Sequence, residues 1–96
     1  MIEYFVYAIY NQIHNKIYIG QTYNLDERLR LHNQKVFKGY TARFDGSWRV
    51  IYFESLSNRQ SALKREKQLK SFRGREFIKK FIEGSAPPAG GGSAID

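Results

Sequence analysis

Residues 4–32 constrain the fold of this chain more than any other stretch. Two apolar, aromatic-rich runs are separated by a short polar break, and a glycine then precedes an amphipathic segment. Because β-branched and aromatic residues favour strands, we expect strands over residues 2–10 and 17–20, joined by a turn over 11–15. The stretch therefore predicts a β-hairpin that leads directly into a helix.

Two tyrosines mark the predicted hairpin. Tyr7 and Tyr18 lie almost symmetrically about Gln12–Ile13, so antiparallel pairing about that point places both phenols on one face as near cross-strand neighbours. A register shift of one residue would move one of them to the opposite face. Gly20 is expected to end the second strand and, lacking a side chain, to allow the close approach of another group or a ligand.

A helix is expected over residues 25–36. Asn24 is a good N-cap, and Glu27 three positions later completes a sequence like a capping box. Arg28 and His32 are four residues apart, so they share one helix face at the margin of the apolar stripe and point towards the two tyrosines. The predicted apolar stripe consists of Leu25, Leu29 and Val36.

The remaining segments continue the alternation of strand and helix. A β-branched and aromatic run predicts a third strand over 48–54, and a capping-box pattern at 57–60 opens a helix over 58–71. A short amphipathic helix is expected over 75–83. The order is strand, strand, helix, strand, helix, helix. We expect one domain over 1–84, followed by a disordered Pro/Gly/Ser/Ala tail over 85–96.

Composition narrows the class of protein. The 96 residues contain no cysteine, which excludes disulfides and thiolate metal sites. No stretch has the apolar length of a membrane span and the N-terminus lacks a basic leader, so a soluble cytoplasmic protein is expected. The net charge of +7 and the pI near 9.8 indicate a polyanionic partner, nucleic acid above all, with an anionic membrane surface as the weaker alternative.

The segment over 37–47 admits two interpretations. It holds two glycines, polar groups and three aromatic residues. Lys38, Tyr40, Thr41 and Arg43 are candidates for contacts with phosphates or bases. Alternatively, the segment is a connecting loop whose aromatic side chains hold it against the core.

Glu66 is the most informative residue of the second predicted helix. It follows Ala62 by four residues and precedes Leu69 by three, so it points into the apolar stripe. A buried carboxylate needs a compensating cation. That cation is a metal ion, an inward arginine such as Arg28, or Lys70 one turn later. Lys64 and its basic neighbours form a cationic rim, which is either a nucleic-acid contact or an ordinary solvated helix face.

These residue types suit the hydrolysis of a phosphodiester. The reaction needs a deprotonated water, charge neutralisation at phosphorus, a stabilised leaving oxygen and a phosphate held in line. Arg28 can neutralise charge, and Glu66 can hold one Mg²⁺ or Mn²⁺. Tyr7 or Tyr18 can act as general base with help from nearby positive charge, and His32 can relay a proton or contact phosphate.

The order and spacing of these motifs resemble the GIY-YIG nuclease family, in particular its small stand-alone bacterial branch. The resemblance covers about residues 4–82. It rests on the following motifs: Phe5-Val6-Tyr7, Tyr18-Ile19-Gly20, Arg28 ten residues after Tyr18, His32, and Ala-Leu-Lys-Arg-Glu-Lys-Gln-Leu-Lys at 62–70. It implies an α+β fold with a small three-stranded antiparallel sheet flanked by helices, one divalent metal on the helix glutamate, and cleavage of DNA strands.

The resemblance also implies roles for particular residues. The family's two tyrosines fall on Tyr7 and Tyr18, its arginine on Arg28, its histidine on His32 and its metal-binding glutamate on Glu66. In addition, Gly39-Tyr40-Thr41 resembles the G-x-T stretch of the stand-alone branch, which makes Thr41 a substrate contact. The chain departs from the family pattern at Phe5, which replaces a glycine, at Gln21, where some members carry lysine, and in having no asparagine after Glu66.

The leading hypothesis is therefore a metal-dependent DNA endonuclease with a single-metal site. The alternative is a nucleic-acid-binding module that has the same fold, does no chemistry and assists repair or recombination. No second recognition domain is visible in the sequence, so long-site specificity would need oligomerisation or a protein partner.

Overall fold

The computed structural model describes residues 3–35 and 39–82. The expected order and the α+β class are confirmed. Val36, Lys38 and the tail over 85–96 lie outside the described residues, so the expectations about them are not addressed. The elements are β1 (Tyr4–Asn11), β2 (Lys16–Thr22), α1 (Leu25–Asn33), the 3₁₀ helix η1 (Tyr40–Arg43), β3 (Trp48–Leu56), α2 (Arg59–Leu69) and α3 (Phe72–Lys79). Within the described ranges, no helix is long and apolar enough to span a bilayer.

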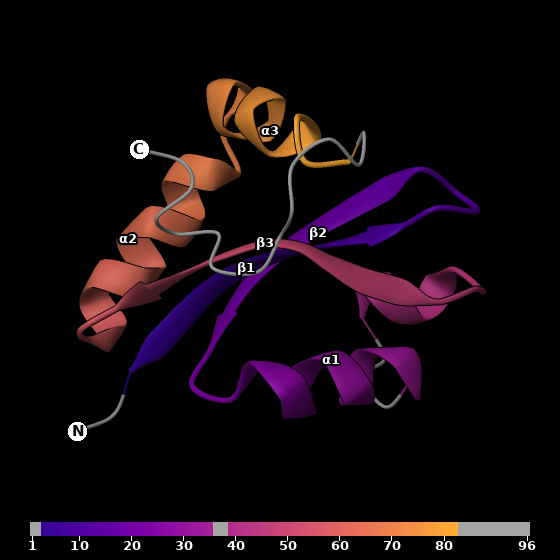
Figure 1. Ribbon diagram of the computed structural model, residues 1–96, viewed down its shortest axis with the longest axis horizontal. Coiled ribbons are helices and arrows are strands. Elements are labelled where there is room, and N and C mark those ends of the chain that lie inside the picture. Colours follow the sequence, from indigo (N-terminus) through magenta and orange to yellow (C-terminus); the bar gives the residue numbers. More distant parts are fainter. Residues whose placement is uncertain (1–2, 36–38, 83–96) are drawn as a thin grey trace.

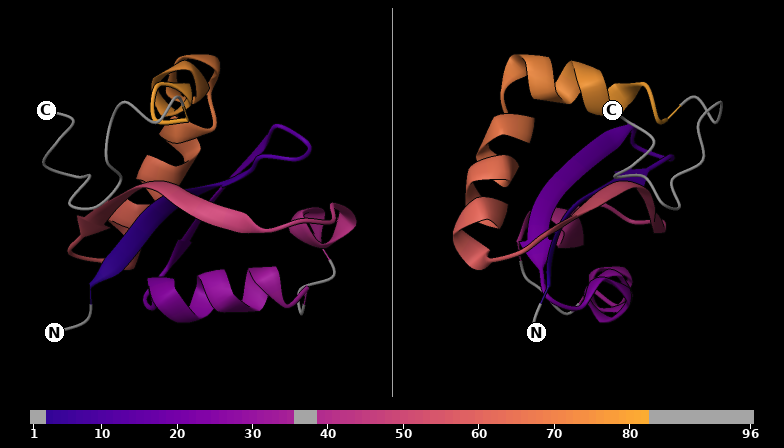
Figure 2. Two further views of the ribbon diagram at one scale, coloured as in Figure 1. Left: turned by 45° about the vertical axis from the view of Figure 1, so that its right-hand side comes forward. Right: turned by 60° about the vertical axis from the view of Figure 1, so that its left-hand side comes forward.

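The three strands form one antiparallel sheet in the order β2-β1-β3, so the first strand is central. Helix α1 lies against one face of this sheet, and α2 and α3 lie against the other (Figure 1). The two turned views show the same arrangement, with the sheet between the helices (Figure 2). Strand β2 is an edge strand of the sheet, so residues from the helices on the two faces can approach each other beside it.

The hairpin register differs from the expected one by two residues. Tyr7 pairs with Gly20 and Ile9 pairs with Tyr18, so the phenols are diagonal neighbours instead of direct partners. The turn is centred one residue later than expected, and it ends at Asn15, whose φ of 54° is left-handed. Because the register differs by two residues, an even number, both tyrosines still lie on the same sheet face, as predicted.

The face covered by α2 and α3 carries the larger apolar core. Val6, Ala8 and Ile19 of the sheet pack there against Leu69 and Ile78. A β-bulge lies where the β1–β3 register shifts between Ala8 and Ile9. It turns the consecutive side chains of Ile51 and Tyr52 towards this same core.

The opposite face carries a smaller, more aromatic core. Tyr7, Ile9 and Trp48 are buried beneath α1, and the predicted stripe residues Leu25 and Leu29 pack against them. The face is assembled from alternate positions of the same strands that form the larger core. Successive residues of β1 therefore belong alternately to the two layers of the molecule.

The ends of several elements differ from expectation. The N-cap Asn24 is confirmed, since its side chain accepts a hydrogen bond from the Glu27 N–H. The cap of α2 lies one residue later than the capping-box pattern at 57–60 predicts, because Asn58 accepts from the Ser61 N–H and the helix begins at Arg59. Helix α1 stops at Asn33, because Lys35 takes a left-handed φ of 59°. Helix α3 begins at Phe72, earlier than expected, because Ser71 caps it by accepting from the Gly74 N–H. Strand β2 continues beyond Gly20 to Thr22.

Candidate active site

A buried chain of hydrogen bonds links three elements on the α1 side of the sheet. The Tyr7 Oη lies 3.0 Å from Nε2 of His32, and the His32 Nδ1 lies 2.8 Å from Oγ1 of Thr41. The three residues are 1 %, 3 % and 2 % exposed, respectively. Strand β1, helix α1 and η1 are thus connected through one imidazole.

Burial determines the protonation states of this chain. Desolvation, reinforced by Arg28 and Lys35, lowers the pKa of His32 to about 4, so the imidazole is neutral at pH 7. A neutral ring donates at one nitrogen and accepts at the other, which matches one hydroxyl partner on each side. Desolvation also raises the pKa of Tyr7 above its ordinary value, and the neighbouring Tyr18 adds to this increase.

Gly20 makes room for the phenol of Tyr7. A Cβ at this position would lie 2.8 Å from the Tyr7 hydroxyl and 3.0 Å from the ring of Tyr18. Gly20 does not end its strand, but the prediction that it permits a close approach is confirmed: the approaching group is the phenol itself. Because Gly20 has no side chain, the Tyr7 hydroxyl has room to lie beside His32.

Tyr18 lies next to this chain and nearer to solvent. Its ring centroid is 5.1 Å from that of His32 and 6.3 Å from that of Tyr7. On its other side, the ring of Tyr40 is stacked on it at 6.2 Å with an interplanar angle of 23°. Tyr18 is half-buried, so its phenol can contact a ligand that Tyr7 cannot reach.

Two groups of opposite charge act on the Tyr7 phenol. The guanidinium of Arg28, on α1, lowers the pKa of Tyr7, whereas the carboxylate of Glu66, on α2, raises it. Both effects are smaller than that of burial. Charged groups from both helical layers therefore act on the same phenol.

Glu66 is held at the end of α2 by an i,i+4 ion pair. Its Oε2 lies 2.7 Å from Nζ of Lys70, and its side chain is 18 % exposed. This is one of the three arrangements expected for a carboxylate in the apolar stripe. The carboxylate is only partly buried, so a ligand can still reach it.

The donor set at Glu66 suits a hard divalent cation that keeps most of its waters. Mg²⁺ is commonly held by one or two carboxylates together with substrate phosphate and water. No cluster of three or more His, Cys, Asp or Glu side chains occurs within residues 3–35 and 39–82, so any such ion would have few protein ligands. The residues present therefore fit a site of one carboxylate, with Lys70 competing for one of its oxygens.

The residues predicted to contact nucleic acid are in different situations. Arg43 on η1 and Lys64 on α2 are exposed, and their contact with DNA stays a prediction. Thr41 is buried and its hydroxyl is bonded to His32, and its contact with a substrate stays a prediction. Lys38 lies outside the described residues.

Sequence reasoning missed the link between Thr41 and His32, and it missed the basic groups contributed by α3. Arg75 lines a hollow together with Tyr18, Tyr40 and Lys70. Spacing could not reveal this contact, because it depends on the angle between α2 and α3. A Cβ on Gly74 would lie 2.4 Å from the Gln68 carbonyl oxygen, so a glycine there permits the close turn between the helices.

The sequence was compared with protein-family models, curated proteins and solved structures. A family model described as the GIY-YIG catalytic domain matches residues 3–79, most of the chain. No curated protein and no solved structure gives a significant match. The matched range includes both tyrosines, the arginine, the histidine and the glutamate described above. The chain therefore belongs to the GIY-YIG family, which indicates nuclease-type activity on DNA and, as in the family generally, dependence on a metal ion.

Proposed function

We propose that this protein is a metal-dependent endonuclease that hydrolyses DNA phosphodiester bonds at the β2 edge. One observation carries the proposal: a buried phenol bonded to a neutral imidazole feels both Arg28 and Glu66, which come from opposite helical layers. A fold that needed only stability would have little reason to bring two opposite charges to one buried hydroxyl.

Glu66 is proposed as the metal ligand. When bound there, Mg²⁺ or Mn²⁺ would supply Lewis-acid stabilisation of charge on a phosphate oxygen. Glu66 contributes a carboxylate that remains partly accessible, and Lys70 keeps that carboxylate oriented before substrate arrives. The approach of a phosphate gives Lys70 a second anionic partner.

Tyr18 is the better candidate for general base. The Tyr7 phenol is buried, its pKa is raised by burial, and its oxygen is already bonded to His32. Tyr18 is half-buried and borders a hollow in which water and a phosphate can reach its hydroxyl. In this proposal the phenolate form of Tyr18 takes the proton of the attacking water and becomes the neutral phenol, while Tyr7 and His32 hold the residues around Tyr18 in place.

Arg28 is proposed to stabilise the negative charge that develops on the phosphoryl oxygens. Its planar group of donors suits phosphate geometry, and helix α1 holds it close enough to influence Tyr7. A positioned cation acts most strongly where water is partly excluded, as it is beside this buried hydrogen-bonded chain.

A cleavage assay tests the proposal. Labelled DNA incubated with the protein and Mn²⁺ should be cut, and EDTA should abolish cleavage. Tyr18→Phe should remove activity in a protein that melts at the wild-type temperature, whereas the same change at Tyr23, an exposed ring, should not. Full activity of the Tyr18→Phe variant would exclude Tyr18 as the base.

The alternative is a non-catalytic DNA-binding module that assists repair or recombination. The ion pair of Glu66 with Lys70 favours it, because that pair satisfies the carboxylate without a metal ion. Binding without cleavage in every substrate and metal condition would support this alternative. In either case we propose action in the cytoplasm, with a partner or a second copy supplying any long-site specificity.

A further inference from the structure

A groove leads away from the candidate active site along β2. Its inner part, of about 270 Å³, is lined by Tyr18 and Lys70, and its outer part, of about 540 Å³, lies beyond them. Ile17, Tyr40 and Arg75 line both parts, so the two parts adjoin. We call this hollow the β2 groove. The outer part alone has the volume of a typical small-ligand pocket.

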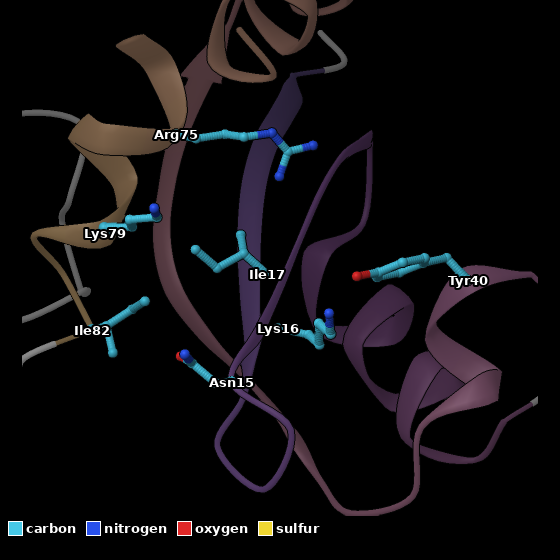
Figure 3. A pocket seen from close by; sticks show the side chains of 7 residues that line it. All are labelled: Asn15, Lys16, Ile17, Tyr40, Arg75, Lys79 and Ile82. Atoms are coloured by element: carbon cyan, nitrogen blue, oxygen red, sulfur yellow. The ribbon is translucent and has the colours of Figure 1, made fainter. Parts of the chain in front are cut away.

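Cationic side chains surround the outer part of the β2 groove. Figure 3 shows Arg75 and Lys79 extending from α3, with Lys16 on the hairpin across from them and Ile17 between. The Nε–H of Arg75 donates to the Lys70 carbonyl at 3.2 Å, which fixes the guanidinium through one of its five donors. Among the described residues, no acidic side chain lines either part of the groove.

Tyr40 stands where the two parts of the groove meet. Its ring is stacked on Tyr18 and contacts the edge of Phe44, with the centroids of Tyr40 and Phe44 5.2 Å apart. It is nevertheless 38 % exposed. An exposed ring that is held in place by other aromatic side chains can form a surface on which a base stacks.

We propose that the β2 groove binds an unpaired DNA strand next to the scissile phosphate. Arg75, Lys79 and Lys16 contact phosphates of this strand, and one of its bases stacks on Tyr40. Bases inside a duplex already stack on one another, so an aromatic platform in a cationic groove is useful only for a single strand. This inference rests on the proposed nuclease function, because it takes the cut to occur near Tyr18.

Binding measurements in EDTA test the groove without cleavage. Fluorescence anisotropy with a labelled thymidine oligonucleotide, and with a hairpin duplex of equal charge, would give affinities over a range of salt concentrations. Tyr40→Ala should weaken single-strand binding about tenfold or more and leave duplex binding nearly unchanged, while Tyr40→Phe retains the wild-type affinity. Arg75→Ala/Lys79→Ala should reduce the slope of log K against log salt by about 1.4, since each single-strand phosphate contact contributes about 0.7.

The matched control is Arg73→Ala/Lys80→Ala, which removes the same charge from the same helical segment but does not alter the groove lining. Its salt slope should stay at the wild-type value. The proposal that the β2 groove binds an unpaired strand would be overturned by either of two results. One is an equal loss of salt slope in both double variants, and the other is an equal loss of affinity for single strand and duplex in Tyr40→Ala. If wild-type protein binds the oligonucleotide as expected but cuts nothing in Mn²⁺, the nuclease proposal fails and the groove stands. Cleavage by wild-type protein together with unaltered binding by the groove variants refutes only the groove.

Discussion

The two faces of the sheet are built from the same strands but differ in chemistry. Beneath α2 and α3 the buried side chains are almost all hydrocarbon or aromatic, as at Val6, Ala8 and Ile78. Beneath α1 the buried set includes an imidazole and hydroxyl groups bonded to one another, at His32, Tyr7 and Thr41. The difference indicates that the face beneath α2 and α3 supplies most of the apolar stabilisation, while the face beneath α1 holds the polar groups of the proposed site in position.

The largest expected effect separates chemistry from stability at the β2 edge. Glu66→Gln should lower the cleavage rate by about 10³-fold or more, because the neutral amide cannot hold a divalent ion or replace the charge. Its ion pair with Lys70 is partly exposed, so the melting temperature should change little. The control is Glu76→Gln, which breaks a similar exposed pair with Lys79. Comparable loss of cleavage in both variants would contradict a special role for Glu66.

A change on the opposite face should give the reverse result. Ile78→Ala removes a fully buried side chain of the larger core and should lower the free energy of unfolding by about 2–5 kcal/mol. At a temperature where the variant remains folded, its cleavage rate per folded molecule should equal that of wild-type protein. Urea unfolding and the nuclease assay measure the two quantities. A large loss of rate in the folded variant would show that the two faces are not separable.

Gly20→Ala should lower both the stability and the cleavage rate, because the added methyl group meets the Tyr7 hydroxyl directly. Displacing that phenol disturbs its bond to His32, and such overpacking is expected to cost about 1–3 kcal/mol. The control is Gly39→Ala, where a Cβ would meet nothing within 4 Å. Thermal unfolding compares the two variants. Wild-type stability and activity in Gly20→Ala would mean that the phenol can move without consequence.

The last prediction concerns pH. In the unfolded chain His32 binds a proton near its ordinary pKa of about 6.5, whereas in the folded protein its pKa is about 4. Between these values the unfolded state holds the extra proton, so stability should fall as pH decreases from about 6.5 to 4, by at most about 1.4 kcal/mol per pH unit.

Urea unfolding of wild-type protein and of His32→Gln at several pH values isolates this contribution. The stability difference between them should shrink as pH falls through the window, since glutamine does not titrate. Parallel curves for the two proteins would contradict a buried, neutral histidine.

The sequence was sufficient to predict the order of the strands and α-helices and the start of α1. A β-branched and aromatic run identifies β1, and Asn24 caps α1 as its position indicates. The cap of α2 was placed one residue too early, because both Ser57 and Asn58 are good capping residues. The end of α1 was missed because it depends on a left-handed Lys35, and lysine is not a residue that signals such a conformation. The hairpin register was missed because no Asn-Gly or similar dipeptide fixes the turn.

The candidate site was only partly predictable, for a related reason. The helical spacing of Arg28 and His32, and the parity of the two strands, place Tyr7 and His32 on facing surfaces from local rules alone. The bond from His32 to Thr41 depends on the path of the intervening loop, which no local rule determines. The inward direction of Glu66 follows from helical period, but only the packing of α2 against the sheet edge decides that it pairs with Lys70.

The central position of β1 has a consequence for dynamics. Tyr7 is flanked along the strand by Val6 and Ala8, and both neighbouring strands are hydrogen-bonded to β1. Local opening at Tyr7 would therefore require the two cores to separate at the same time. Its amide hydrogen should exchange with solvent only when the whole domain unfolds, so the proposed reactive centre should be as rigid as the most protected backbone.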